Sequence, residues 1–273
     1  MAASLLVLTD FFQPANHALD YAVALAGPLG ARLVLLHVHR DSVLDPELLT
    51  GKLANLDTEA IDSAFARLTH NLPVPVVSEV AHGQVGDAIA TAVRHHHPVL
   101  IVLGRPDTEN TPEELISTTA LDLLRTAPYP MLVVPRKGPV LPARRLLLAV
   151  DGEPFTLGEQ AGAVRHLFAT LHAELTVLCV AEHATSKTTA DEVLDSVQRT
   201  GLTTDLPQSI GFRAAVASHP ATGILHVAQP DEYDMVVLFA RPRSFWGELF
   251  RRSVTAQVLL RSAVPVLVLP TTA

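Results

Sequence analysis

The segment LLVLTD at residues 5–10 occurs a second time in the chain, as LLLAVD at residues 146–151. Two more segments repeat at nearly the same separation: ARLVLLHV at 31–38 returns as AELTVLCV at 173–180, and PMLVVP at 130–135 returns as PVLVLP at 265–270. A repeat over the whole chain indicates two similar domains. The stretch at 136–145 between them is rich in proline and charge, as linkers are. The repeat therefore predicts one domain at 1–138 and a second at 144–273.

Each half alternates short apolar runs with longer stretches of helical periodicity. The runs are 5–10, 32–38, 74–80, 99–104 and 131–134, then 146–151, 174–180, 210–216, 234–239 and 265–269. Runs so rich in Val and Leu are typical of strands buried on both faces of a parallel sheet. After the first run, Ala18, Ala22, Leu25 and Leu29 recur at helical spacing, and Gly30 is placed to end that helix. The alternation predicts two three-layer α/β domains, whose ligands bind beyond the carboxyl ends of the strands.

The composition excludes several classes of protein. Of the 273 residues, 48% are hydrophobic and 18% are charged, which is enough for a sizeable core. The net charge of -8 argues against a nucleic-acid partner, which requires a basic face. The single cysteine, Cys179, excludes an internal disulfide and a thiolate metal cluster. No apolar run approaches the ~20 residues that span a bilayer, so we expect a cytoplasmic protein without a membrane partner.

Polar residues stand where the predicted strands end. Asp10 and Asp151 each close the first apolar run of their half. Such an aspartate either caps the following turn or accepts a hydrogen bond from an adenine amino group or a ribose hydroxyl. The fourth run of the first half leads into GRPD at 104–107 and then STTA at 117–120. The counterparts in the second half are FARP at 239–242 and RSVT at 252–255.

These segments resemble the universal stress protein family, the UspA family, over nearly the whole chain. The nucleotide-binding members of that family carry a glycine, two residues, a second glycine, nine residues, and then Gly-Ser or Gly-Thr. The LTD at 8–10, the His-Val at 37–38 and the VAHG at 80–83 also resemble family patterns. The resemblance implies two tandem Rossmann-like domains of the adenine nucleotide alpha hydrolase-like type. Each would be a five-stranded parallel sheet of order 3-2-1-4-5 flanked by helices.

The resemblance also implies how the two halves meet. The family pairs its domains through the last strand, which here places Met131–Val134 edge to edge with Val266–Leu269. This pairing covers two apolar strands that would otherwise be exposed sheet edges. One chain then forms a pseudo-dimer, and a homodimer of two chains is left open.

The first half departs from the family's phosphate motif at two positions. Gly104 matches the first glycine and Thr118 matches the hydroxyl, whereas Asp107 and Ser117 replace the other two glycines. Glycines let backbone N–H groups approach phosphates without a side chain in the way. An aspartate adds like-charge repulsion to that loss. We therefore expect a nucleoside or a monophosphate to bind in preference to ATP.

The second half departs further, because Phe239, Pro242 and Arg252 replace all three glycines and Ser253 alone matches. Proline has no N–H to donate, and the bulk of Phe239 should intrude on the pocket. For any bound nucleotide, the resemblance implies two sets of contact residues. In the first half these are Asp10, Val38, Gly104, Asp107, Ser117, Thr118 and Thr119; in the second half they are Asp151, Arg243 and Ser253.

The loops that replace the phosphate motif have opposite charge. The first, at 104–118, holds four acidic residues against Arg105. The second, at 239–253, holds four arginines against Glu248, with aromatic residues at 245, 246 and 250. The two loops are either differently solvated surfaces or, over Arg241–Arg252, an anchor for a protein partner such as the acidic loop of a second copy. A third alternative is that Arg241 and Arg243 hold an anion.

The histidines do not form a recognisable metal site in the sequence. The three at 95–97 are adjacent on a helix end and point in different directions, which suits a helix terminus better than zinc. His37 and His39 share a face of one strand, but no other ligand is placed beside them. Cys179, in an apolar strand, is typical of an inert core residue, and no catalytic motif is present.

Two functions remain open from the sequence. The first is a non-catalytic regulatory or interaction module of the stress response, with degraded ATP-binding motifs and no required cofactor. The alternative is an adenine-nucleotide-binding protein that takes AMP or ATP in its first domain and hydrolyses ATP weakly. The degraded glycines favour the first function, whereas Asp10, Gly104 and Thr118 support the second.

Overall fold

The first half of the chain folds as a parallel sheet covered by helices. In the computed structural model, the described residues are 3–11, 13–39, 58–105, 129–140, 143–158, 161–181, 189–204, 206, 209–241 and 253–272. The strands of the first half are β1 (Ser4–Leu8), β2 (Arg32–His39), β3 (Val76–His82), β4 (Leu100–Gly104) and β5 (Met131–Val134). Its described helices are α1 (Gln13–Leu29), α3 (Thr58–Thr69) and α4 (Val85–His96).

The second half repeats this plan. Its main strands are β6 (Arg145–Val150), β8 (Glu174–Ala181), β9 (Gly211–Val216), β10 (Met235–Ala240) and β11 (Val266–Thr272). Its described helices are α6 (Ala161–Thr170), α7 (Ala190–Arg199), α8 (Pro220–Val227) and α9 (Val254–Arg261). The short strand β7 (Thr156–Leu157), which the sequence pattern does not predict, pairs antiparallel with the end of β11.

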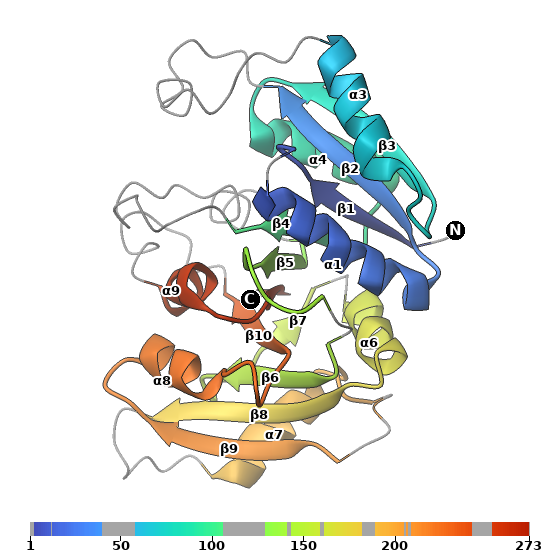
Figure 1. Cartoon of the computed structure of the whole chain (residues 1–273). Coiled ribbons are helices and arrows are strands. Elements are labelled where there is room, and N and C mark those ends of the chain that lie inside the picture. Colours follow the sequence, from blue (N-terminus) through green and yellow to red (C-terminus); the bar gives the residue numbers. More distant parts are fainter. Residues whose placement is uncertain are drawn as a thin grey trace.

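The strands of both halves form one continuous sheet (Figure 1). Its order is β3-β2-β1-β4-β5-β11-β10-β6-β8-β9, so each half has the order 3-2-1-4-5 that the resemblance implies. The last strands meet at the centre, where β5 pairs antiparallel with β11 and Leu132 lies opposite Leu267. Because this pairing is antiparallel, the start of β11 lies beside the end of β5. We call the line between β5 and β11 the seam.

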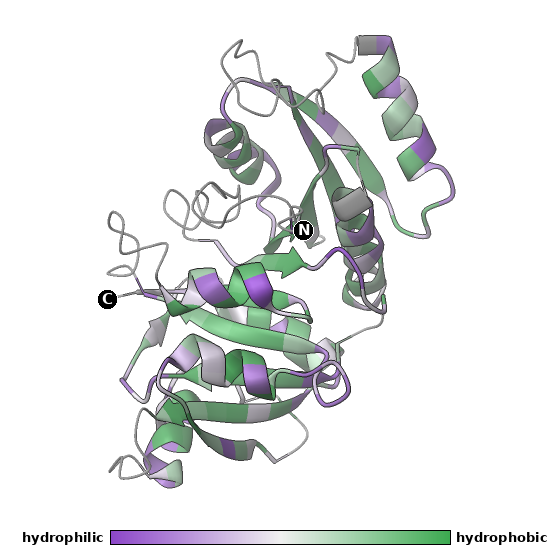
Figure 2. Ribbon diagram, turned by 60° about the vertical axis from the view of Figure 1, so that its left-hand side comes forward, coloured by the Kyte–Doolittle hydropathy of each residue, from purple (hydrophilic) through white to green (hydrophobic). Residues whose placement is uncertain are grey.

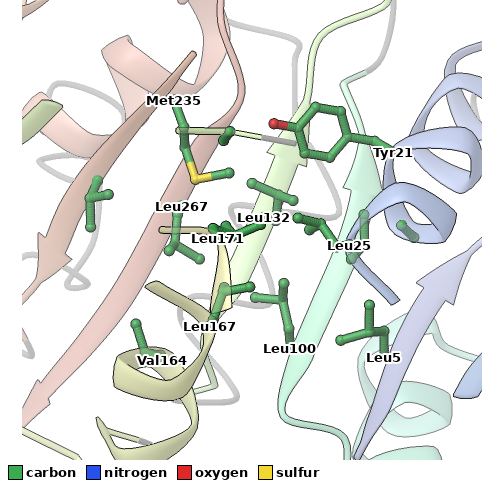
Figure 3. Close-up of a cluster of buried hydrophobic side chains, with 14 of the residues drawn as sticks. Leu5, Tyr21, Leu25, Leu100, Leu132, Val164, Leu167, Leu171, Met235 and Leu267 are labelled. Carbon is green, nitrogen blue, oxygen red and sulfur yellow. The ribbon is translucent and has the colours of Figure 1, made fainter. Parts of the chain in front are cut away.

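Two apolar clusters lie on the two faces of the sheet. One packs α1, α3, α6 and α7 against one face, and the other packs α4, α8 and α9 against the opposite face. Figure 2 shows the strands as predominantly hydrophobic, with hydrophilic residues along the helices. The first cluster crosses the seam, because side chains of α1 and β5 share it with side chains of α6, β10 and β11 (Figure 3). The two halves therefore share a core.

Tyr21 of α1 lies in this shared core and is 2% exposed. It belongs to the same cluster as Leu132 and Met235, which come from opposite sides of the seam (Figure 3). Burial raises the pKa of Tyr21, and the carboxylate of Asp234 raises it further. Within the described part of the chain, the Tyr21 hydroxyl has no hydrogen-bond partner.

The outer strands differ from the sequence prediction. We predicted every apolar run as a strand buried on both faces, but Val77 of β3 is 40% exposed and Val216 of β9 is 61% exposed. The order 3-2-1-4-5 explains the difference, because it places the third strand of each half at an outer edge of the sheet. An edge strand has a neighbour on one side only and receives less cover from the helices.

The first predicted helix is present and ends where expected. Helix α1 continues through Pro28 to Leu29, and Gly30 then adopts a φ of 57°. The N–H of Ala31 closes the end by donating to the carbonyl of Ala26 at 2.9 Å. The helix predicted near 116–127 lies outside the described residues. None of the helices within the described ranges is long and apolar enough to cross a membrane.

Candidate functional site

The candidate site of the first half lies at the carboxyl edge of the sheet, where β1, β2 and β4 end. Asp10 is exposed two residues beyond β1. The preceding residue, Thr9, is buried: its N–H donates to the carbonyl of Leu36 at 3.0 Å, and its Oγ1 accepts from the N–H of Phe11 at 3.0 Å. These bonds fix the turn that presents the Asp10 carboxylate at the edge.

Aromatic contacts of Phe11 also stabilise this turn. Phe11 has a φ of 65°, and its ring centroid lies 4.5 Å from that of His37 and 5.1 Å from that of Phe65. His37 is 8% exposed, and its Nδ1 donates to the carbonyl of Thr9 at 2.9 Å. Burial lowers the pKa of His37, although Asp10 and the hydrogen bond to Thr9 act in the opposite direction. A neutral His37 therefore supports the turn.

Val38, the other predicted contact on β2, is half-buried on the face that carries α4. His39 and His82 end two paired strands, with their ring centroids 5.4 Å apart. Among the residues that the structure describes, no three His, Cys, Asp or Glu side chains are grouped so as to hold a metal ion. His96, one of the three adjacent histidines, lies at the end of α4, with its Nε2 2.6 Å from Glu79 Oε2.

The phosphate loop of the first half begins at Gly104, the last residue of β4. The next residue, Arg105, donates its N–H to the carbonyl of Val134 at 2.8 Å. Five predicted contact residues lie outside the described residues: Asp107, Ser117, Thr118, Thr119 and, in the second half, Arg243. The structure thus brings Asp10, Val38 and Gly104 to one edge and leaves the remaining positions as predictions.

The matching aspartate of the second half, Asp151, is engaged by an arginine. Arg241 Nε donates to Asp151 Oδ2 at 3.0 Å, and Arg241 Nη2 donates to Oδ1 at 2.8 Å. The same guanidinium donates to the carbonyls of Glu153 at 3.1 Å and Pro154 at 3.2 Å. Two parallel hydrogen bonds of this kind make a bidentate arginine–carboxylate pair, which is stronger than a pair joined by one bond. The alternative that Arg241 and Arg243 hold an anion stays a prediction, because Arg243 lies outside the described residues, whereas Arg241 here engages Asp151.

Phe239 fills the position that Gly104 has in the first half. Gly104 pairs with Val134 on β5, and Phe239 pairs with Leu269 at the matching position on β11. The Phe239 ring lies 4.0 Å, centroid to centroid, from the ring of Phe155. Phe239 therefore packs against an aromatic partner, and its intrusion on a ligand pocket stays a prediction. Arg241, Asp151, Phe239 and Phe155 together form what we call the closure of the second half.

Two further residues of the second half have structural roles. Ser253 is the N-cap of α9, and its Oγ accepts from the N–H of Ala256 at 3.1 Å. Cys179, the counterpart of His37 in the repeat, is half-buried. Burial raises the pKa of its thiol, and the nearby Asp151 raises it further. A raised pKa disfavours the reactive thiolate, which agrees with the predicted inert role.

The sequence reasoning missed two residues that matter at these edges, Phe155 and Arg105. Phe155 follows Asp151 in a loop with no repeated pattern, so no sequence signal identified it. Arg105 stood within the quoted GRPD segment, and its position next to Gly104 was the available signal.

Comparisons with known proteins agree with this fold. The model of the universal stress protein family matches the chain twice, at residues 1–135 and 142–270. The fold resembles a universal stress protein from Archaeoglobus fulgidus DSM 4304, with a TM-score of 0.70, 15% identity and 98% of each chain covered. It also resembles a functionally unknown protein from Pseudomonas aeruginosa PAO1, with a TM-score of 0.64, 18% identity, and 99% of this chain and 93% of that chain covered.

A third solved structure with this fold is the cytoplasmic domain of a prokaryotic cation chloride cotransporter. The TM-score is 0.53 at 12% identity, with 98% of this chain and 95% of that chain covered. At such identities the three structures show the fold alone. The comparison with curated proteins gives no match.

Proposed function

The chain belongs to the universal stress protein family, and on that premise we propose that it is a non-catalytic regulatory module of the stress response. In this proposal the second half has lost nucleotide binding, and any adenine nucleotide binds in the first half alone. The observation that carries the proposal is the closure of the second half. The side chain that would accept a hydrogen bond from the ligand, Asp151, is paired with Arg241 instead.

The closure opposes a ligand in two ways. A nucleotide that used the Asp151 carboxylate would have to break both bonds from Arg241, and Arg241 would also lose the carbonyls of Glu153 and Pro154. The phosphates would meet the ring of Phe239 where the first half has Gly104. A ligand would have to replace each of these bonds, so binding competes with the closed arrangement.

The first half lacks the side chains that make this closure. The position matching Arg241 is Pro106, and the position matching Phe239 is Gly104. Asp10 is exposed at the edge, on a turn fixed by Thr9 and His37. These observations support the alternative function, binding of AMP or ATP by the first half with weak ATP hydrolysis. We rank binding without turnover above hydrolysis, because the replaced glycines would serve to orient the outer phosphates.

Isothermal titration calorimetry with adenosine, AMP and ATP tests this proposal. We expect at most one nucleotide per chain, with AMP tighter than ATP and no phosphate released from ATP. Asp10→Ala should abolish binding, whereas the matched variant Asp151→Ala should leave it unchanged. Two nucleotides per chain, or a loss of binding in Asp151→Ala alone, would show that the assignment of the halves is wrong.

A protein partner at Arg241–Arg252 and a homodimer in the cytoplasm are further parts of the proposal. Residues 242–252 lie outside the described residues, so this part rests on the sequence. The opposite charges of the loops at 104–118 and 239–253 would steer two copies together. Sedimentation at low and high salt, on the parent and on Trp246→Ala, tests it. An equal size in all four measurements would contradict self-association.

A further inference from the structure

Two histidines meet at the carboxyl ends of β2 and β3, the two outermost strands of the first half (Figure 1). His39 is the last residue of β2, and His82 is the last residue of β3. The strand register places them opposite each other, and their ring centroids lie 5.4 Å apart. Residues that are distant in the sequence thus present two imidazoles side by side, which we call the histidine pair.

The backbone around the histidine pair is fixed by hydrogen bonds. The N–H of Gly83 donates to the carbonyl of His39 at 3.0 Å, which extends the pairing of the two strands by one residue. Gly83 has a φ of 97°, so the chain turns there from β3 toward α4, which begins at Val85. His39 is half-buried and His82 is exposed, so the pair borders on solvent.

The second half forms the same strand ends without histidine. Ala181 and Val216 are paired at the ends of β8 and β9, as His39 and His82 are at the ends of β2 and β3. The N–H of Ala217 donates to the carbonyl of Ala181 at 3.0 Å, which matches the bond in the first half. The fold therefore forms with an alanine and a valine at these positions, and it does not require the imidazoles.

The distance between the two rings suits a shared metal ion. Imidazole nitrogen is a ligand that Zn²⁺, Cu²⁺ and Ni²⁺ bind well, whereas Mg²⁺ and Ca²⁺ prefer oxygen. Zinc–nitrogen bonds of about 2 Å at a tetrahedral angle place the centroids of two ligand rings about 5 Å apart. The 5.4 Å between His39 and His82 is close to that value. A ligand histidine binds with one ring nitrogen and commonly donates a hydrogen bond with the other, so other contacts of these rings are compatible with ligation.

His37 faces the same side of β2 but has a different task. Its Nδ1 donates to the carbonyl of Thr9, and its ring packs against Phe11. Within the part of the chain that the structure describes, no third His, Cys, Asp or Glu makes the histidine pair a larger group. The site is therefore defined by two ligands, His39 and His82, and any additional ligand would add to their affinity.

We propose that the histidine pair binds a divalent transition-metal ion such as Zn²⁺ at the outer edge of the first half. This site goes beyond the proposed function, because it requires no nucleotide. A bound ion would join the end of β3, the outermost strand, to the end of β2 and would stabilise the folded chain. The matching position of the second half, with Ala181 and Val216, would bind no metal.

Calorimetry with Zn²⁺ alone, on the full chain, tests the site, and Mg²⁺ serves as the ion that should not bind. His39→Ala and His82→Val each introduce the residue of the second half, where the fold accepts it. Each should weaken the tightest Zn²⁺ binding by about a hundredfold, because two ligands held together bind more tightly than one. His95→Ala is the matched control, since its ring lies 6.4 Å from that of the adjacent His96, and it should leave the affinity unchanged.

Thermal unfolding with and without Zn²⁺ gives a second measurement. Zn²⁺ should raise the unfolding temperature of the parent and of His95→Ala more than that of His39→Ala or His82→Val. Parent-like Zn²⁺ affinity in both pair variants, equal shifts in all four proteins, or Mg²⁺ binding as tight as that of Zn²⁺ would each overturn the inference.

A reciprocal exchange tests whether the strand register is sufficient for the site. The double variant Ala181→His and Val216→His gives the second half the same two ligands on the same backbone. We expect this variant to bind one Zn²⁺ more than the parent with a similar affinity. An unchanged number of bound ions would overturn the inference that this register creates a metal site.

Discussion

The turn after the first strand is stabilised differently in the two halves. In the first half, Phe11 and His37 pack below the turn and leave Asp10 exposed above it. In the second half, Arg241 pairs with Asp151 from above, and Phe239 packs on Phe155 beside it. The strands carrying these residues have the same order and register. A repeated fold can thus keep its backbone while different side chains stabilise the turn after the first strand in each copy.

The largest expected effect comes from the place where the halves are alike. Leu132 and Leu267 lie opposite each other on β5 and β11, and both are fully buried. Replacing either with Ala should lower the free energy of unfolding by about 2–5 kcal/mol, because each change leaves a cavity in the shared core. Urea unfolding should show one transition for both halves. Two separate transitions would contradict the idea that the halves share a core.

The next largest effect on the free energy of unfolding is expected from exchanging glycine and alanine at matching positions of α8 and α4. A Cβ at Gly223 of α8 would lie 2.6 Å from Val180 Cγ1, so α8 packs closely on β8. Ala88 precedes the buried Ile89 of α4 as Gly223 precedes the buried Ile224, and it accommodates its methyl group. We expect Gly223→Ala to cost about 2 kcal/mol through overpacking.

The matched variant Ala88→Gly should cost about 1 kcal/mol, through backbone entropy alone. Thermal unfolding of the two variants measures both costs. A Gly223→Ala variant as stable as the parent would show that α8 can move away from Val180, and that the close packing of the second half is not a constraint.

The variant Tyr21→Phe tests the shared core at the seam. The hydroxyl of Tyr21 is buried without a hydrogen-bond partner in the described part of the chain. Its removal should raise the free energy of unfolding by about 1 kcal/mol, since the buried group then no longer has to be desolvated. Chemical denaturation of the parent and the variant measures this gain. A loss of stability instead would indicate that the hydroxyl is bonded in solution.

The smallest expected effect is a pH dependence of stability that differs between the two halves. The folded chain lowers the pKa of His37 from its ordinary value of 6.5, so the unfolded chain takes up the proton first as the pH falls. Stability is therefore complete above about pH 6.5 and declines below it. His37→Asn, which keeps a donor for the Thr9 carbonyl, should show a weaker decline between pH 7.5 and 5.5 in urea unfolding.

Cys179, the counterpart of His37, responds at the other end of the pH range. Burial raises the pKa of its thiol from the ordinary value of 9.0, so its contribution is complete below that pH and is lost as the pH rises through the folded value. Cys179→Ala should therefore reduce the decline of stability above pH 9 and leave the acid side unchanged. An identical acid profile in His37→Asn and the parent would contradict the role given to His37.

Much of the candidate site was accessible from the sequence because it lies at strand ends. Asp10 and Gly104 were identified as ends of apolar runs, and both stand at the carboxyl edge of the sheet. The match of Phe239 to Gly104 also followed from the repeat, and the strand register places the two residues at equivalent positions. The pairing of Arg241 with Asp151 did not, because it joins residues 90 positions apart and depends on the direction of a loop side chain.

The features that the sequence predicts depend on local pattern, and those that it does not predict depend on contacts in space. Apolar runs determine where a strand forms and an internal repeat determines that the fold occurs twice, since both depend on side chains that neighbour each other along the chain. The exposure of β3 and β9, the neutralisation of Asp151 and the bond from Arg105 to the carbonyl of Ser262 across the seam depend on which elements become neighbours in space. Tertiary structure alone decides these, because the partner of a charged side chain is selected by packing geometry and lies far away in the sequence.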